Sequence, residues 1–286
     1  MKIKKLLYTI FVIILICFAY LALSFSPIFF QDLYQTETLK PIITAHRGAS
    51  SLAPENTLAS IKAALKLNPD RIEIDVQQTL DSVVVLMHDI TLNRTTNGTG
   101  LIKEKTFKAI SKLDAGSWFS STFIGEKIPI LEDAIQLTKG KCQLIIEIKK
   151  GSDFYPNIEK NILNLIVKHN AEKWVIIHSF DYAVLEKIHN LNSNIPIHKL
   201  FFGKLKSLPY VISNKLEYLD IEKYTFIKEY SINYVFANKE TISYLKSKDK
   251  KINVWTVNDY KNINELMALG IDGIITDNPN VLNKQQ

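Results

Sequence analysis

Short apolar runs alternate with amphipathic stretches from about residue 41 to the end of the chain. Most of the runs have no polar face, which is typical of strands that are buried on both sides. Eight runs qualify, at residues 42–46, 71–76, 144–149, 174–179, 195–201, 232–237, 252–257 and 273–277. Stretches with apolar residues at every third or fourth position lie between them, most clearly at 56–67, 157–169, 181–190, 238–249 and 259–269. This alternation predicts βα units that build a parallel sheet.

The number of strands and their spacing predict how the sheet is arranged. Eight strands with intervening helices in about 245 residues match the usual size of a TIM, or (β/α)8, barrel. A doubly wound open sheet is the alternative that the same pattern allows. In a barrel, the active site forms at the C-terminal ends of the strands, so the polar residues that end each run are the candidates for chemistry.

The apolar run at 83–88 does not fit the alternation. It follows the second strand too closely for a parallel crossover, so it is expected to return as the second arm of a hairpin. A two-residue turn at Asp81-Ser82 would place His88 opposite Asp75. The stretch at about 89–129 is rich in Thr, Gly, Ser and Lys, and we expect it to form a small insertion over the barrel mouth.

The N-terminal segment is expected to be a membrane anchor. Residues 6–31 carry no charge and are long enough to cross a bilayer as one helix. Three lysines precede this segment, which places the N-terminus in the cytoplasm and the large domain outside it. The expected organisation is an anchor at 1–31, a linker at 32–40 and a catalytic domain at 41–286.

A cleaved signal peptide is the alternative for the same segment, because Ala22-Leu23-Ser24 offers small residues to a peptidase. The domain would then be secreted. In both cases it is exported, yet its only cysteine is Cys142, so it cannot form an internal disulfide.

Composition excludes a nucleic-acid-binding protein. The net charge is +6, of which residues 1–40 supply four lysines against two acids, leaving about +4 spread over the domain without blocks. The oligomeric state is not predicted by any feature of the chain.

Three acids are candidates for a metal site. Side chains alternate along a strand, so Glu73 and Asp75 share one face, as do Glu147 and Lys149. Three carboxylates at one barrel mouth repel one another unless a cation neutralises them. Oxygen ligands without thiolate favour one hard divalent cation, Mg²⁺ or Ca²⁺. The alternative is a structural network in which the acids pair with nearby arginine and lysine side chains.

Two histidines and two cations are expected at the same rim. His46 ends the first strand and His88 ends the hairpin arm, and two imidazoles can share proton removal and proton donation. Arg47 and Lys149 are suited to bind phosphoryl oxygens, which indicates an anionic substrate. Trp255, at the end of the seventh strand, is a candidate substrate contact, with core packing as the alternative.

Other polar residues are interpreted as structural. Pro54-Glu55-Asn56-Thr57 opens the first helix, and capping explains most of this motif. Four further histidines fall inside predicted strands or late in predicted helices, namely His169, His178, His189 and His198.

Together these residues resemble the glycerophosphodiester phosphodiesterase family. The motifs that carry the resemblance occur in order over residues 43–279. They are His46-Arg47-Gly48, Pro54-Glu55-Asn56-Thr57, Glu73-Ile74-Asp75-Val76, His88-Asp89, Asn93-Arg94-Thr95-Thr96-Asn97-Gly98, Asp114-Ala115-Gly116-Ser117-Trp118-Phe119, Ile128-Pro129-Ile130-Leu131-Glu132, Glu147-Ile148-Lys149, His178-Ser179-Phe180, Trp255-Thr256-Val257-Asn258 and Thr276-Asp277.

The resemblance implies a TIM barrel with an insertion and a reaction that splits a glycerophosphodiester into an alcohol and sn-glycerol 3-phosphate. Water is the final acceptor, and the nucleophile is either water or the glycerol 2-hydroxyl. The implied roles are acid–base catalysis by His46 and His88, metal binding by Glu73, Asp75 and Glu147, and phosphate binding by Arg47 and Lys149. Residues 202–230 match the family least, so substrate choice is least defined there.

Two other functions remain open from the sequence. A phospholipase of the C or D type, acting on intact lipids, is suggested by the membrane anchor. A membrane-anchored binding protein without enzymatic activity would need a barrel that has lost its site, whereas every predicted catalytic position is filled.

Overall fold

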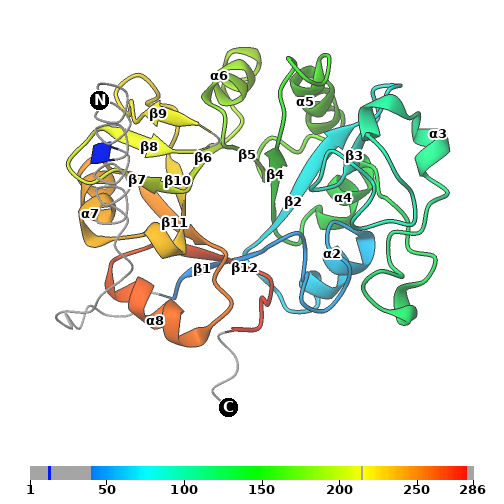
Figure 1. Cartoon of the computed structure of the whole chain (residues 1–286), viewed down its shortest axis with the longest axis horizontal. Coiled ribbons are helices and arrows are strands. Elements are labelled where there is room, and N and C mark those ends of the chain that lie inside the picture. The colour runs from blue at the N-terminus through cyan, green and yellow to red at the C-terminus, as the bar shows by residue number, and fades with distance from the viewer. Residues whose placement is uncertain (1–11, 14–39, 214, 282–286) are drawn as a thin grey trace, which may run out of the picture.

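The eight predicted strands form a closed parallel barrel. The computed structural model describes residues 12–13, 40–213 and 215–281. In the order in which they pair around the barrel, the strands are β1 (Ile42–Ala45), β2 (Arg71–Gln78), β4 (Gln143–Ile148), β5 (Val175–Ser179), β6 (Ile197–Phe201), β10 (Glu229–Asn233), β11 (Lys251–Trp255) and β12 (Gly273–Thr276). Strand β12 pairs with β1, which closes the sheet, so the predicted barrel is confirmed and the open sheet is wrong (Figure 1).

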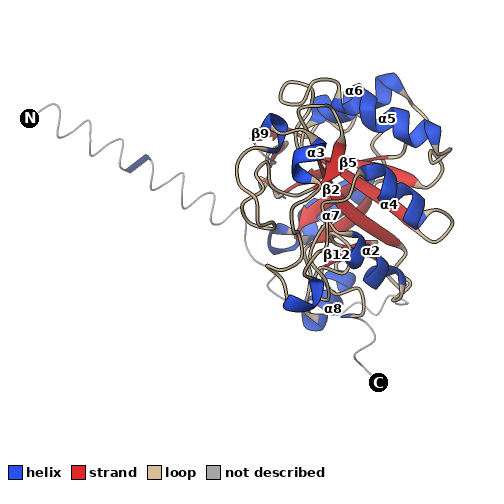
Figure 2. Cartoon of the chain, turned by 90° about the vertical axis from the view of Figure 1, so that its right-hand side faces the viewer, coloured by secondary structure: helices blue, strands red, loops and turns tan. Residues whose placement is uncertain are grey.

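Helices surround the barrel, with the strands inside (Figure 2). The five predicted helices are confirmed as α2 (Leu58–Leu65), α5 (Ile158–Lys168), α6 (Tyr182–Leu191), α7 (Lys239–Ser247) and α8 (Tyr260–Ala268), and α4 (Leu131–Thr138) lies before β4. Several start where a side-chain oxygen caps the first turn, as Asp181 and Asp259 do. Amphipathic periodicity and caps therefore predicted these helices well.

The sixth strand lies earlier in the chain than predicted. Instead of 232–237 it is β10, which ends at Asn233, and Tyr234–Phe236 form a 3-10 turn. The Asn233 side chain accepts a hydrogen bond from the Val235 amide, which stabilises that turn. The strand begins with Glu229, a charged residue that is buried inside the barrel. Because a buried strand is expected to be apolar, the sequence did not indicate a strand there.

A small antiparallel sheet follows β6 and was not predicted. It contains β7 (Gly203–Lys204), β8 (Tyr210–Ile212) and β9 (Leu216–Tyr218). Figure 1 shows it in yellow-green beside the barrel wall, between the ends of α6 and α7. We refer to β7, β8 and β9 together as the small sheet.

The predicted hairpin exists, but its register differs by one residue. Strand β3 (Val84–Leu86) pairs antiparallel with β2. The amide of Met87, and not that of His88, approaches Asp75, with its nitrogen 3.0 Å from the Asp75 carbonyl oxygen. His88 follows the end of β3, so its side chain reaches the barrel mouth through a turn of the chain beyond the hairpin.

The hairpin loop explains the difference in register. The loop is closed by a hydrogen bond of 3.0 Å from the Thr79 amide to the Val83 carbonyl, which leaves three residues in the loop rather than two. Ser82 has a φ of 63°, the left-handed conformation that three-residue hairpin loops require. Glycine is the residue expected in this conformation. Because the chain has serine there, the sequence did not indicate the longer loop.

Residues 89–129 lie beside β3 and α4, outside the barrel (Figure 1). The segment contains α3 (Phe107–Ile110) and 3-10 turns at Ile102–Glu104 and Ser121–Phe123. It packs around a small apolar core of its own, formed by Val85, Met87, Leu92, Ile102, Ile110, Ala115 and Ile128. That core attaches the segment to the hairpin that precedes His88.

The predicted anchor lies almost entirely outside the described residues, as does nearly all of the linker. Among the residues described, no helix has both the length and the apolar character needed to cross a membrane.

A buried ion pair lies inside the barrel at the N-terminal ends of the strands. Arg71 donates two hydrogen bonds to the carboxylate of Glu229, at 2.7 and 3.0 Å, and Asn253 donates a third at 3.0 Å. Burial acts against the charged form, but His198 and Arg71 prevail and lower the pKa of Glu229 to about 2. The pair therefore keeps a charged carboxylate inside the barrel.

Replacing Arg71 should destabilise the fold far more than replacing a surface base. Arg71→Met leaves Glu229 as an uncompensated buried charge, so we expect a loss of about 3–5 kcal/mol in the free energy of unfolding. Lys246→Ala, which breaks the half-exposed ion pair with Asp272, should cost about 1 kcal/mol or less. Urea unfolding measures both values, and similar losses would contradict the importance of the buried pair.

Candidate active site

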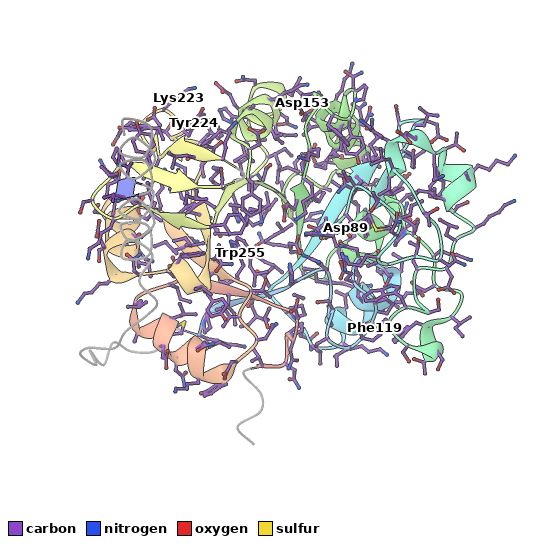
Figure 3. The ribbon with its side chains drawn as sticks, in the orientation of Figure 1. Asp89, Phe119, Asp153, Lys223, Tyr224 and Trp255 are labelled. Atoms are coloured by element: carbon purple, nitrogen blue, oxygen red, sulfur yellow. The ribbon has the colours of Figure 1, made fainter. Side chains whose placement is uncertain are left out.

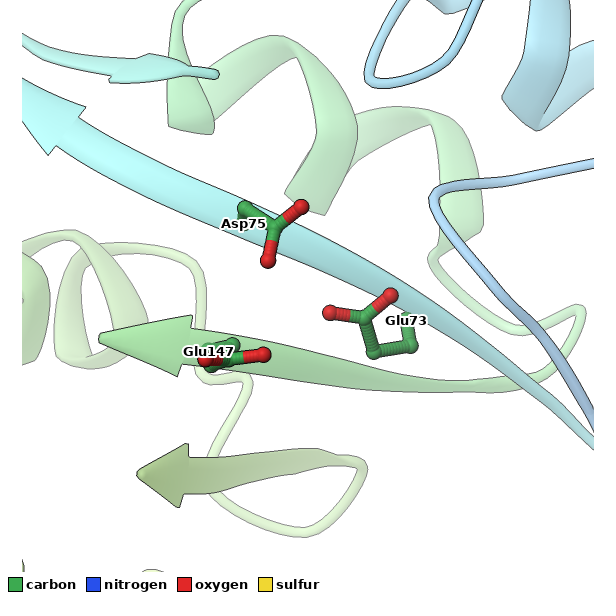
Figure 4. Close-up of side chains that lie close together, drawn as sticks. All are labelled: Glu73, Asp75 and Glu147. Atoms are coloured by element: carbon green, nitrogen blue, oxygen red, sulfur yellow. The ribbon is translucent and has the colours of Figure 1, made fainter. Parts of the chain in front are cut away.

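Three buried carboxylates converge at the barrel mouth. Glu73 and Asp75 come from the inner face of β2, and Glu147 comes from β4, where it lies next to Asp75 in the register of the two strands. Their side chains are buried, and one oxygen of each lies within 4.8 Å of an oxygen of the other two (Figure 4). The structure thus brings Glu73 and Asp75, which alternation placed on one face of their strand, together with Glu147 of the neighbouring strand.

The acids differ in how easily they hold their charge. Burial and the neighbouring carboxylates raise the pKa of Glu73 well above its ordinary value. Burial also raises the pKa of Glu147, to about 7, although Lys149 opposes this change. At Asp75 burial has the same tendency, but Lys149 and Arg47 outweigh it and lower the pKa.

Basic side chains neutralise the cluster only in part. The Lys149 ammonium lies 2.9 Å from Asp75 and 2.7 Å from Glu147, and Arg47 Nε lies 3.3 Å from Asp75. Glu73 accepts one hydrogen bond, from the Arg47 amide at 2.9 Å, through Oε2. Its other oxygen, Oε1, is buried with neither a hydrogen bond nor an ion pair among the described residues. A purely structural network therefore leaves one oxygen uncompensated, and a hard divalent cation fits this all-oxygen set.

Arg47 is held in place by an unusual backbone. It has a φ of 55°, and the next residue, Gly48, has a φ of 82°. A Cβ atom at Gly48 would lie 2.6 Å from the main-chain carbon of Ser60, so only glycine fits there. The turn directs the Arg47 guanidinium to Glu55, at 2.8 Å, and towards Asp75.

The motif at the start of α2 takes part in the site, contrary to the capping interpretation. Only Thr57 caps the helix. Asn56 donates to the Asp75 carboxylate at 2.8 Å and accepts from the Asp75 amide at 2.9 Å, while Glu55 binds Arg47 and Arg94. A helix start needs only one capping residue, which is Thr57. The two polar residues before it, Glu55 and Asn56, were the signal in the sequence that the motif has another role.

His46 is oriented by a carboxylate that the sequence reading did not assign. Its Nδ1 atom lies 2.6 Å from Asp277 Oδ1. Asp277 also accepts hydrogen bonds from Ser50 and Asn258 at 2.9 and 2.6 Å. Burial opposes its charge, but the bonds from His46, Asn258 and Ser50 lower the pKa of Asp277 to about 2.

His88 has the same arrangement with Asp89. Its Nδ1 atom lies 2.7 Å from Asp89 Oδ1, and Arg94 holds Asp89 with two hydrogen bonds of 2.8 and 3.1 Å. Burial lowers the pKa of His88, with Asp75 acting against this and Lys149 and Arg47 reinforcing it. Since each Nδ1 meets a carboxylate, and no described residue hydrogen-bonds to either Nε2, the Nε2 atoms are available to a substrate.

Ion pairs connect the acid cluster to His88 without a break. Arg94 donates to Glu55 at 2.8 Å through two nitrogens, and Glu55 in turn binds Arg47. The whole chain of contacts runs through Asp75, Arg47, Glu55, Arg94, Asp89 and His88. Sequence reasoning missed Glu55, Asp89 and Arg94, which lie in quoted motifs but have no role that spacing reveals.

A cavity of about 160 Å³ lies at the centre of these residues. Its ionisable lining side chains include His46, Arg47, Glu73, His88, Glu147 and Lys149, and its rings include Phe180, Phe202 and Trp255. Figure 3 shows Asp89 and Trp255 at different sides of the barrel mouth. Trp255 therefore lines the cavity, while its contact with a substrate stays a prediction, and Phe180 and Phe202 were not predicted to lie there.

His178, interpreted as structural, also borders the cavity. It is buried, both of its ring nitrogens are without hydrogen-bond partners among the described residues, and burial lowers its pKa well below the ordinary value. His198 is buried next to it, with the two ring centroids 6.0 Å apart. The uncharged form of His178 thus forms part of the cavity floor.

A second, open groove adjoins the cavity on the far side of His46 and Arg47. It has a volume of about 590 Å³ and is lined mainly by hydroxyl, amide and carboxylate groups, from Ser50, Ser51, Glu55, Asn258, Asp277 and Asn278. Polar hydrogen-bonding groups therefore border His46 and Arg47 in the groove, and aromatic rings share the cavity with them.

Comparison with known proteins gives a consistent result. Residues 46–281 match the model of the glycerophosphoryl diester phosphodiesterase family. A glycerophosphodiester phosphodiesterase of Caldanaerobacter subterraneus is 37% identical over 247 residues, covering 85% of this chain and 97% of the relative. One from Bacillus subtilis is 33% identical, covering 85% of each chain.

Solved structures that resemble this chain include phosphodiesterases of the same kind. A phosphodiesterase of Oleispira antarctica, determined in complex with the product sn-glycerol-3-phosphate, superposes with a TM-score of 0.76 at 27% identity, covering 85% of this chain and 96% of that one. A glycerophosphodiester phosphodiesterase of Agrobacterium tumefaciens superposes with a TM-score of 0.70 at 25% identity, covering 85% and 99%.

Removing one charge from the acid cluster should stabilise the metal-free protein. Because the pKa of Glu147 is about 7 in the fold, the unfolded chain loses this proton first as the pH rises, and stability falls up to about pH 7. Without divalent metal, Glu147→Gln should therefore melt a few degrees above the wild type at pH 8, with a smaller difference at pH 5. Thermal unfolding in chelator measures this.

The matched control is Glu104→Gln, which neutralises an exposed acid outside the cluster. It should leave the melting temperature within about one degree of the wild type at both pH values. If Glu147→Gln behaves in the same way, the three carboxylates do not destabilise the metal-free fold.

Proposed function

Because the chain belongs to the glycerophosphoryl diester phosphodiesterase family and is therefore a phosphoric diester hydrolase, we propose that its barrel-mouth site performs metal-dependent, two-histidine cleavage of glycerophosphodiesters. The products are an alcohol and sn-glycerol 3-phosphate. One observation carries the proposal: two members of the three-carboxylate cluster, Glu73 and Glu147, line the same cavity as two carboxylate-oriented histidines. The product bound to the Oleispira phosphodiesterase supports the choice of substrate.

Arg47 and Lys149 are the proposed phosphate ligands. Both line the cavity, and both lie against carboxylates. When bound by Glu73, Asp75 and Glu147, a Mg²⁺ or Ca²⁺ ion would neutralise charge on the phosphoryl oxygens. With the acids compensated in this way, the ammonium of Lys149 and the guanidinium of Arg47 are available to the anionic substrate.

His46 and His88 are the proposed acid–base pair. One accepts the proton of the nucleophile, and the other donates a proton to the departing alkoxide. Both line the cavity, and a carboxylate on Nδ1 fixes the orientation of each ring. The nucleophile is either water or the glycerol 2-hydroxyl, and detection of a cyclic phosphate intermediate by phosphorus NMR distinguishes the two.

A membrane location accompanies this proposal. The charge-free segment 6–31 and the lysines before it support a single N-terminal anchor with the barrel outside the cytoplasm, or secretion if the segment is cleaved. This segment also favours the second candidate function, a phospholipase that acts on intact lipids. Assays with glycerophosphocholine and phosphatidylcholine in parallel distinguish the two activities, and protease treatment of intact cells tests the location of the barrel.

Removal of divalent metal should abolish activity. We expect hydrolysis of glycerophosphodiesters to stop in chelator and to return on addition of Mg²⁺ or Ca²⁺, because without metal Lys149 and Arg47 stay paired with the acids. Glu147→Ala should be inactive at every metal concentration, while Glu104→Ala should keep wild-type activity. Release of sn-glycerol 3-phosphate is the measurement, and full activity in chelator would refute the three-carboxylate site.

His88 should be essential, and its pH response should depend on Asp89. His88→Ala should lower kcat by about 10²–10⁴-fold, whereas His189→Ala, at a residue that does not line the cavity, should not. The bond from Asp89 raises the pKa of His88, so Asp89→Asn should move one limb of the bell-shaped kcat/KM profile to lower pH and leave the other in place. An unchanged profile would contradict this pairing.

A further inference from the structure

Three aromatic rings form one wall of the cavity. Phe180 stacks on Phe202 with their centroids 5.3 Å apart, and Trp255 meets each of them edge-on, at 5.6 and 5.3 Å. The rings follow or end β5, β6 and β11, whereas the acid cluster comes from β2 and β4. We call Phe180, Phe202 and Trp255 the aromatic wall.

The aromatic wall offers no hydrogen bonds to a ligand. Its one polar atom, Trp255 Nε1, already donates to the Ser231 carbonyl at 3.1 Å. Hydroxyl groups placed against the wall would lose water without gaining partners, which disfavours a polyol. Methyl groups and a weakly hydrated cation, by contrast, are attracted to ring faces. The hydroxyl- and amide-lined groove beyond His46 and Arg47 is better suited to the glycerol half of the substrate.

We propose that the aromatic wall selects the alcohol half of the diester, and that it favours a quaternary ammonium alcohol over a polyol. This inference rests on the proposed function of the same site. Phe202 is the outermost part of the wall, with 37% of its surface exposed, so it is the ring that an incoming alcohol meets first.

The small sheet positions Phe202. The Phe202 amide donates to the Ile212 carbonyl at 2.7 Å, immediately before β7 pairs with β8. The small sheet therefore holds in place the ring that we propose contacts the alcohol half of the substrate.

A buried lysine attaches the small sheet to the barrel. Lys199, on β6, is fully buried, and its ammonium donates to the Phe180 carbonyl and to Glu217 on β9 at 3.0 Å. Ser213 donates to the same Glu217 oxygen at 2.6 Å. One ammonium thus connects the main chain of Phe180 to the sheet that carries Phe202. Lys199 is a positioning residue, because it acts on the substrate only through these rings.

The test compares two diesters in the full-length enzyme. We expect the wild type to have a higher kcat/KM for glycerophosphocholine than for glycerophosphoinositol. Phe202→Ala should lower the ratio of the two values about tenfold, mainly through KM for the choline diester. The matched control is Leu216→Ala, which truncates a 61% exposed side chain on β9 that does not line the cavity, and it should leave the ratio unchanged.

The role of Lys199 is tested by a double-mutant cycle. Lys199→Met should lower the ratio in the same direction as Phe202→Ala, and the double variant should lower it no further than Phe202→Ala alone. Additive effects would overturn the positioning role. If Lys199→Met does not fold, Glu217→Gln takes its place in the cycle, with the same expected outcomes.

The outcomes separate this inference from the function on which it rests. An equal loss for both diesters in Phe202→Ala would overturn the inference, because it would place the wall against the shared glycerol. A wild-type preference for glycerophosphoinositol would also overturn it, with the proposed function intact. No turnover of any diester by the wild type would overturn the proposed function and this inference with it.

Discussion

Repulsion among three buried carboxylates is the constraint around which the barrel mouth is built. Asp75 and Glu147 are adjacent in the register of β2 and β4, so the strands themselves force the charges together. Lys149 and Arg47 offset part of this charge, and Asn56 fixes the orientation of Asp75. The uncompensated oxygen of Glu73 shows that the protein alone does not complete the neutralisation. This uncompensated oxygen supports the proposal that the site binds a cation together with an anionic substrate.

The two ends of the barrel treat buried charge in opposite ways. At the N-terminal ends of the strands, Arg71 donates two hydrogen bonds to Glu229 and Asn253 donates a third, so both carboxylate oxygens have partners within the protein. At the mouth, the acids outnumber the bases in contact with them and retain free ligand atoms. The same parallel topology thus provides a stabilising ion pair at one end and a reactive cluster at the other.

Periodicity predicted the barrel, its strands and its helices, because burial against helices requires apolar runs of fixed length and spacing. It also predicted which acids share a face. It failed at Ser82, where a left-handed serine lengthened the hairpin, and at Glu229, where a buried charge disguised a strand. The partners of the two histidines, Asp277 and Asp89, depend on side-chain hydrogen bonds, and spacing along the chain carries no information about those.

The unbroken chain of ion pairs between Asp75 and His88 has a thermodynamic consequence. Each arginine in it is shared between two carboxylates, so a change of charge at one end alters the electrostatic potential at the other. Coupling between two sites is reciprocal, so a cation that binds the acids must change the proton affinity of His88 by the same factor by which that proton changes the affinity for the cation. In this arrangement, the proposed metal binding and the protonation of His88 are two linked equilibria.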